Sequence, residues 1–284
     1  MTIDIHTHLG KIHRGQSYLG PEDLIEWMDK NEIEKCVVLP LENPEENHYY
    51  VLTKDILEIA HRFPQRIIPF CNVDPRIWVR GTDPYWHPET DLKDIVEDYV
   101  KEGAKGFGEI LAGLYIDDPR LKNIFRVCGE LKIPVLLHLD AMRCIDELHF
   151  PRFKKVLSEF RNTIFIAHGP HWWGEMSEDA DEKCLQIHPT GRIKGRGMTI
   201  KILEDYPNIY GDLSANSGYN ALTRDPEFGF RFLEEHSDKL LFGTDYLSPG
   251  QETPIVEYLK NAPIENKKKQ DILGNNAKRL LRLN

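Results

Sequence analysis

Eight short runs of apolar and β-branched residues alternate along this chain with amphipathic, helix-like segments. Continuous apolar strands separated by helices are typical of a parallel sheet covered on both faces, and eight such units predict a closed (β/α)8 TIM barrel. The alternative is an open doubly wound sheet, which usually has fewer strands. The predicted strands are Thr2–Leu9, Lys35–Pro40, Ile67–Asp74, Ala104–Ile110, Ile133–Asp140, Thr163–Gly169, Ile209–Ala215 and Leu240–Tyr246.

The segments between these strands have apolar residues at helical spacing. No tract rich in glycine, serine or proline divides the chain, so we expect residues 1–284 to form one barrel domain. A long loop on the active face is expected at about 171–196, and a closing helix at about 267–283. The other predicted helices are Pro21–Asn31, Glu46–Phe63, Leu92–Glu102, Pro119–Leu131, Pro151–Phe160, Gly197–Tyr206, Pro226–His236 and Pro254–Lys260.

Composition narrows the classes of function. The 36 Lys and Arg against 46 Asp and Glu give a formal charge of −10, which argues against nucleic-acid and membrane-surface binding. No apolar run reaches the ~18 residues of a membrane span, and the N-terminus lacks the pattern of a signal peptide. The five cysteines include no C-x-x-C pair, which argues against a cysteine zinc site. We therefore expect a cytoplasmic protein that acts on a small molecule.

Side chains that can bind a metal occur in the first predicted strand and at the ends of four others. The carboxyl ends of barrel strands are where enzymes of this architecture place their catalytic groups. A buried imidazole or carboxylate without a partner is costly, and a metal ion supplies that partner. The sequence therefore predicts a metal centre. Its candidate ligands are His6, His8, Glu109, His138, His168 and Asp245.

Several of these motifs together resemble the amidohydrolase superfamily of metal-dependent barrels. They are the D-I-H-T-H motif at Asp4–His8, the strand-end His138 and His168, and the T-D pair at Thr244–Asp245. The tail Asn275–Leu281 resembles the closing helix of that superfamily. More narrowly, the chain resembles the amidohydrolase-related (amidohydrolase 2) branch, which contains hydrolases and non-oxidative decarboxylases such as aminocarboxymuconate-semialdehyde decarboxylase. PHP-type phosphoesterases share the H-x-H start.

The resemblance implies roles for these residues. His6, His8 and Asp245 would hold a first metal ion. His138 and His168 would hold a second ion, or, in a mononuclear site, one would bind the ion and the other the substrate. Asp245 would also take the proton of the attacking hydroxide and pass it to the leaving group, so Asp245, His138 and His168 are the catalytic candidates.

Glu109 is the residue that distinguishes between hydrolysis and decarboxylation, the two reactions found in this branch. It stands where two-metal members have a bridging lysine or glutamate, and decarboxylases generally lack an acid there. TatD-like nucleases also have G-E, but Ile110–Ala112 replaces their G-L-D, which argues against a nuclease. We therefore expect a hydrolase that uses a metal-activated hydroxide to cleave an amide, lactone or ester-like bond.

The runner-up function is a metal-dependent non-oxidative decarboxylase, a carboxy-lyase, on the same scaffold. A PHP-type phosphoesterase and a non-catalytic metal-binding or assembly protein are further alternatives. Four imidazoles and two carboxylates suit one or two divalent ions, with Zn²⁺ expected and Mn²⁺, Co²⁺ or Fe²⁺ as alternatives.

Other residues are candidates for contact with the substrate or for support of the ligands. Loop arginines could hold a substrate carboxylate, and loop tryptophans could wall the substrate pocket or seal a homodimer contact. The substrate-binding candidates are Arg14, Arg143, Trp172 and Ser214. Asp4 could orient an imidazole or could be a buried structural acid, and Asp212 could belong to the site or be an ordinary polar residue of the barrel lining. The remaining histidines, expected to bind no metal, are His13, His48, His61, His149, His188 and His236.

Overall fold

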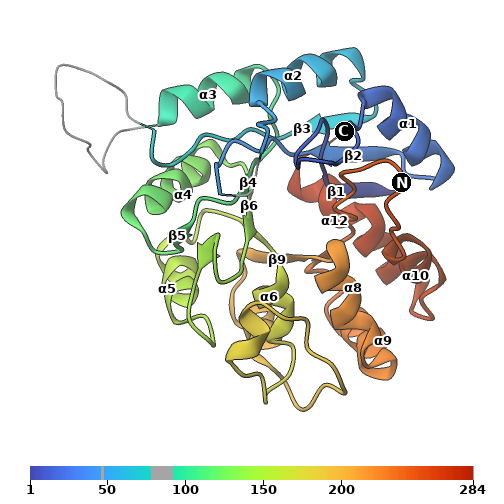
Figure 1. The fold of residues 1–284 in the computed structure, drawn as a ribbon. Helices are drawn as coiled ribbons and strands as arrows, with labels where there is room; N and C mark the ends of the chain where they lie inside the picture. The colour runs from blue at the N-terminus through green and yellow to red at the C-terminus, as the bar shows by residue number, and fades with distance from the viewer. Residues whose placement is uncertain (46–47, 78–91, 284) are drawn as a thin grey trace.

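The structure, a computed structural model, describes residues 1–45, 48–77 and 92–283. Within these ranges every predicted barrel strand is present, and Figure 1 shows helices surrounding the strands. The strands are shorter than predicted because their end residues, including apolar ones such as Phe70 and Phe242, belong to loops. The barrel strands are β1 (Ile3–Thr7), β2 (Lys35–Val38), β3 (Ile67–Pro69), β4 (Phe107–Ile110), β6 (Val135–His138), β8 (Phe165–His168), β9 (Ile209–Asp212) and β10 (Leu240–Leu241).

The strands form a closed barrel. Parallel pairing gives the order β1-β2-β3 and the order β10-β9-β8-β6-β4. Two parallel bridges join these sheets, one from Cys71 to Phe107 and one from Thr7 to Tyr246. Backbone bonds such as Ile5 N to Phe242 O, at 2.9 Å, complete the second seam. The open doubly wound alternative is therefore wrong.

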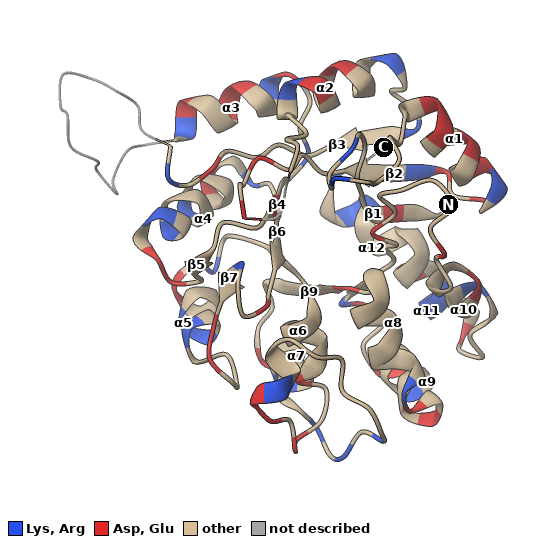
Figure 2. Ribbon diagram, in the orientation of Figure 1, with Lys and Arg blue, Asp and Glu red and all other residues tan. Residues whose placement is uncertain are grey.

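Helices cover the outside of the barrel, and Figure 2 shows charged residues along α1 to α4. Apolar faces of these helices pack on the strands, so the charges remain in solvent. The helices that follow β1 to β8 are α1 (Pro21–Lys30), α2 (Thr53–Arg62), α3 (Lys93–Lys101), α4 (Pro119–Leu131), α5 (Pro151–Glu159), α6 (Pro170–Gly174) and α7 (Met198–Asp205). Those after β9 and β10 are α8 (Ala215–Thr223), α9 (Pro226–Glu235) and α10 (Ile255–Asn261).

The C-terminal segment closes the amino end of the barrel. It consists of α11 (Asn266–Gln270), the π-helical turn η2 (Asp271–Asn275) and α12 (Asn276–Leu280), in the region predicted as the closing helix. Leu280 and Leu281 pack against interior residues such as Ile3 and Val37. These interior residues come from most of the barrel strands, which identifies the inward face of each strand.

Some element predictions were wrong. Helix α2 begins at Thr53 and not at Glu46, because Leu41 and Val51 pair as an antiparallel bridge in the preceding loop. Two short strands, β5 (Leu114–Tyr115) and β7 (Cys144–Ile145), pair outside the barrel and were not predicted. Helices α6 and α8, both of which lack charged residues, were not predicted either. Trp78 and Trp86, two of the loop tryptophans that could wall the substrate pocket, lie outside the described residues.

The predicted loop at 171–196 is only partly a loop. It contains α6 and a 3-10 turn, η1 (Glu182–Leu185). Trp172 and Trp173 are 0% and 1% exposed and pack with the core residues Phe153 and Phe232. In the described part of the chain, no helix combines the length and apolar character that crossing a membrane requires.

Candidate metal centre

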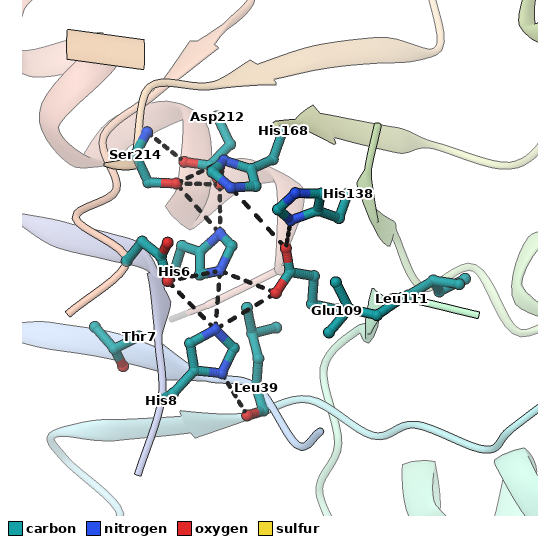
Figure 3. Close-up of polar contacts among 12 residues, drawn as sticks. His6, Thr7, His8, Leu39, Glu109, Leu111, His138, His168, Asp212 and Ser214 are labelled. Carbon is teal, nitrogen blue, oxygen red and sulfur yellow. Dashed lines mark hydrogen bonds and ion pairs between the residues drawn. The ribbon is translucent and has the colours of Figure 1, made fainter. Parts of the chain in front are cut away.

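The six predicted ligand side chains meet inside the barrel at the carboxyl ends of its strands. Figure 3 shows the four imidazoles and the Glu109 carboxylate converging on one another. They form three overlapping groups of donor atoms, each within 4.8 Å. The groups are His6, His8 and Glu109; His6, His168 and Asp245; and Glu109, His138 and His168. Each of the six predicted ligands belongs to at least one of these groups.

A bulge in β1 turns its histidines into the barrel. Ile5 faces the interior, so an unbroken alternation would turn His6 and His8 outward, toward the helices. Between Asp4 and Thr7, however, β1 has one residue more than β2 opposite it, which is the pattern of a β-bulge. Asp4 Oδ1 accepts the His6 backbone N–H at 3.0 Å and stabilises this shape.

A second irregularity positions Glu109. Between Phe107 and Ile110, β4 also has one residue more than its partner strand β6. Gly108 has a φ of +126°, and a Cβ added there would lie 2.5 Å from the Leu136 carbonyl oxygen. Only glycine fits this combination of backbone conformation and close approach. Gly108 therefore allows Glu109 to face the barrel axis.

The Glu109 carboxylate lies between the two halves of the site. Its Oε2 is 3.5 Å from Nε2 of both His6 and His8. Its Oε1 accepts a hydrogen bond of 2.7 Å from Nδ1 of His138 and lies 3.9 Å from Nε2 of His168. Burial alone would raise the pKa of Glu109, but the charges of His6 and His138 hold that pKa well below its usual range.

His138 and His168 follow the ordinary alternation of β6 and β8 and are paired directly across the two strands. Burial alone would lower the pKa of His138, but the Glu109 and Asp140 carboxylates raise it to about 10. Burial and the neighbouring His6 lower the pKa of His168 to about 4. His168 is therefore a neutral imidazole at neutral pH, the form that binds metals.

Asp245 approaches from the last strand, in a left-handed backbone conformation with a φ of +56°. Aspartate tolerates this conformation better than most residues. Its Oδ1 lies 3.5 Å from Nε2 of both His6 and His8. The Asp245 side chain is 21% exposed, whereas those of His6 and His8 are 0% and 2% exposed. Asp245 and His138, which is 18% exposed, therefore form the open side of the site.

Asp212 and Ser214 support the imidazoles from behind. His6 Nδ1 donates to Asp212 Oδ2 at 2.7 Å, and Ser214 Oγ donates to the same oxygen at 2.8 Å. Since the Ser214 hydrogen is used in this way, its oxygen accepts from His168 Nδ1 at 2.9 Å. These contacts fix the two rings and leave both Nε2 atoms facing the site.

The chemistry of the donor set fits a divalent cation. His8 Nδ1 donates to the Leu39 carbonyl at 3.1 Å, so the neutral ring carries its lone pair on Nε2, as in His6. These two Nε2 atoms face each other at 3.1 Å, an arrangement that requires a cation or a proton between them. Donor atoms about 2.1 Å from one cation lie roughly 3.0–3.4 Å apart, close to the spacing observed here.

Asp140, which the sequence did not single out, connects the site to Arg143. Asp140 Oδ2 lies 3.5 Å from His138 Nε2 and bonds to the Arg143 guanidinium. Its Oδ1 accepts the backbone N–H groups of Met142 and Arg143, each at 2.7 Å. The D-x-x-R spacing at 140–143 was the available signal, because an acid that caps a turn can also bind an arginine three residues later.

The other residues predicted to contact the substrate or to support the ligands lie in different parts of the structure. Trp172 is completely buried in the core, and Ser214 lies behind the imidazoles, away from the open side. Arg14 is exposed in the loop after β1. Among the described residues, Asp4 has no bond to an imidazole; it bonds to Thr244, at 2.6 Å through the hydroxyl, and so links β1 to the end of the last strand.

The family model described as amidohydrolase matches residues 3–283. The chain belongs to the amidohydrolase family. The family match and the ligand geometry together identify a metal-dependent type of enzyme. Among curated protein sequences, none matches this chain.

Solved structures support the barrel fold of this amidohydrolase at low sequence identity. An uncharacterised TIM-barrel protein from Bordetella bronchiseptica has 16% identity and a TM-score of 0.66, covering 99% of this chain and 98% of its own. A dihydroxybenzoic acid decarboxylase from a Polaromonas species has 14% identity and a TM-score of 0.63, covering 99% and 97%. A probable 2-pyrone-4,6-dicarboxylic acid hydrolase from Acinetobacter baumannii has 14% identity and a TM-score of 0.58, covering 99% of each chain. These likenesses establish the fold alone.

Proposed function

We propose that this amidohydrolase is a metal-dependent hydrolase that cleaves an amide, lactone or ester-like bond of a small substrate bearing a carboxylate. The observation that carries the proposal is the position of Glu109 between two groups of imidazoles. Its two oxygens face His6 and His8 on one side and His138 and His168 on the other. A carboxylate in this position suits two cations that share a ligand.

His6, His8 and Asp245 would hold one cation and His138 and His168 the other, with Glu109 common to both. Divalent cations supply positive charge that lowers the pKa of a bound water and polarises a substrate oxygen. Zn²⁺ is compatible with this donor set. Mn²⁺ is as well, and it is the metal described in the Polaromonas decarboxylase.

Asp245 is the proton carrier of the proposal. Its Oδ1 faces His6 and His8, which leaves Oδ2 on the open side to accept a proton and return it to the leaving group. Burial alone would raise the pKa of Asp245, but the neighbouring His6 and His8 hold it below its usual value. A carboxylate with a low pKa is ionised at neutral pH and ready to accept that proton.

Arg143 carries the proposed preference for an anionic substrate. Its guanidinium is bonded to Asp140, and Asp140 lies beside His138 on the open side. The Arg143 side chain is 16% exposed, so a substrate carboxylate can approach it. The probable pyrone-dicarboxylate hydrolase is described with citric acid bound, which supports a carboxylate-bearing substrate for this fold.

A non-oxidative decarboxylase is the second candidate. This function is favoured because several similar structures are named decarboxylases, including the Polaromonas enzyme with manganese and 2-nitroresorcinol. In that reaction the imidazole of His138, which Glu109 and Asp140 hold between them, is the group placed to move a proton.

Turnover assays distinguish the two reactions. Lactones, amides and aromatic acids are incubated with the metal-loaded enzyme, and both ring opening or amine release and CO₂ release are followed. The proposal predicts hydrolysis without CO₂ release. On the substrate found, Asp245→Asn lowers kcat about 10²–10⁴-fold, whereas Asp146→Asn, a change at a buried aspartate that accepts the Phe153 backbone N–H, does not. CO₂ release from an aromatic acid, with no hydrolysis, would overturn the hydrolase proposal in favour of the decarboxylase.

A further inference from the structure

A cavity lies where residues 175–197, which connect α6 to α7, meet the C-terminal end of α8. We call these residues the α6–α7 segment (Figure 1). The cavity has a volume of about 470 Å³, and none of the six candidate ligands lines it. Its wall combines the α6–α7 segment with Arg224, the residue directly after α8.

Arg224 is the unusual residue of this cavity. Its Nε and Nη2 atoms are both buried, and neither finds a hydrogen-bond acceptor among the residues that the structure describes. Nε and Nη2 form one edge of the planar guanidinium, the edge that pairs in parallel with two oxygens of a carboxylate or phosphate. A buried charged donor without an acceptor is costly, so a bound acceptor, above all an anionic one, would stabilise this edge.

The acidic residues nearby are already bonded to other groups. Asp179 pairs with Lys194 Nζ at 2.7 Å, and Asp181 accepts the Lys183 backbone N–H at 3.0 Å. Asp225 Oδ2 accepts the Ile193 backbone N–H at 3.1 Å. Across residues 1–45, 48–77 and 92–283, none of these three carboxylates makes a hydrogen bond to Arg224.

The charge of the cavity is opposite to that of the chain. Four basic side chains and only two acidic ones line it, in a protein with a formal charge of −10. Figure 2 shows acidic and basic residues gathered on the α6–α7 segment. The basic lining residues are Lys183, Arg192, Lys194 and Arg224, and the acidic ones are Asp179 and Asp181.

We propose that this cavity binds a small molecule carrying a compact oxyanion, a phosphate or a carboxylate, through the Nε and Nη2 edge of Arg224. Arg192 and Lys183 add positive charge from the α6–α7 segment. Because the two Arg224 atoms are covered in the structure, the ligand enters as residues 186–192 move outward. Most of these residues are exposed, so they make few buried contacts that oppose the movement.

Helix α8 joins the neighbourhood of this site to that of the metal centre. Helix α8 begins directly after Ser214, which bonds to His168, and ends directly before Arg224. The binding proposal itself does not rest on the proposed hydrolase function.

Hydrogen–deuterium exchange and thermal unfolding test the site with defined probes. Inorganic phosphate and citrate, at ionic strength matched with chloride, are added to the metal-loaded wild type and to Arg224→Gln, Arg224→Lys and Arg161→Gln. Arg161 is an exposed arginine outside the cavity and serves as the control for loss of one charge. We expect one or both anions to slow exchange in residues 183–194 of the wild type and of Arg161→Gln.

Arg224→Gln should weaken this protection about tenfold to a hundredfold in apparent affinity, because two charge-assisted hydrogen bonds are lost. Arg224→Lys, which keeps the charge without the parallel edge, should also bind more weakly than wild type. Protection by phosphate alone identifies a phosphate ligand, and protection by citrate alone a carboxylate. If neither anion protects residues 183–194, or if Arg224→Gln is protected as strongly as wild type, the proposal is wrong. Should Arg224→Gln not fold, Arg192→Gln replaces it and must show weakened protection.

Discussion

Replacing Asp212 with asparagine tests how the second layer of residues prepares the metal centre. Asp212 Oδ2 accepts hydrogen bonds from His6 Nδ1 at 2.7 Å and from Ser214 Oγ at 2.8 Å, and the side chain is fully buried. Asparagine can still accept one bond, but it removes the charge that strengthens both. Supporting residues of this kind contribute about 10- to 100-fold to metal affinity, which corresponds to about 1.4–2.7 kcal/mol. We expect a loss of this size in Asp212→Asn.

The assay is competition for the metal between the protein and a chromogenic chelator. Asp146→Asn is the matched control, because Asp146 is also a buried aspartate that accepts backbone N–H groups but contacts no candidate ligand. The control should keep its metal affinity even if its stability falls. An affinity of Asp212→Asn within about twofold of wild type, less than the contribution expected of a supporting residue, would refute the idea that Asp212 fixes the His6 ring for metal binding.

Three further predictions follow from the geometry. Gly108→Ala should lower the free energy of unfolding, measured in urea, by about 1–3 kcal/mol or more. The reason is that Gly108 has a φ of +126° and that the alanine Cβ would meet the Leu136 carbonyl. Unchanged stability would contradict the close approach. Asp140→Asn should cost about 1–3 kcal/mol through its bond to Arg143, whereas the more exposed Asp118→Asn should cost less than about 1 kcal/mol. Chelation of divalent ions should lower Tm, since a metal at a hundred times its Kd contributes about 2.7 kcal/mol; an unchanged Tm would argue against a bound metal.

The alternation of apolar strands and helices was enough to predict the barrel, because that pattern follows from burying a parallel sheet on both faces. The predicted placement of His138 and His168 also follows from alternation, since Leu136 and Ile166, two residues earlier, face the barrel interior. These parts of the fold depend only on the two-residue alternation of side chains along a strand and on the order of the strands.

Other features depend on local backbone shape, which the alternation of residue types along a strand does not encode. His6 and Glu109 face the site only because β1 and β4 each carry an extra residue against a neighbouring strand. Strict alternation would have turned both outward. A glycine before Glu109 and an aspartate two residues before His6 were the only hints in the sequence, and neither identifies a bulge by itself.

Burial could not be predicted for the aromatic residues after β8. Trp172 and Trp173 follow a strand that ends in a candidate ligand, which suggested a substrate pocket. Instead, α6 turns both side chains toward Phe153, Phe232 and the core. The orientation of a five-residue helix depends on packing between distant segments, so the local sequence does not determine it.

Metal analysis of the purified protein tests the central claim most directly, namely that side chains from separate barrel strands hold divalent cations. Protein purified without chelators and dialysed is analysed for metals, together with Glu109→Ala and the double variant His6→Ala and His8→Ala. We predict about two ions per chain in the wild type, with at least one lost from each variant. A wild type without metal, or variants with the same metal content as wild type, would contradict the account.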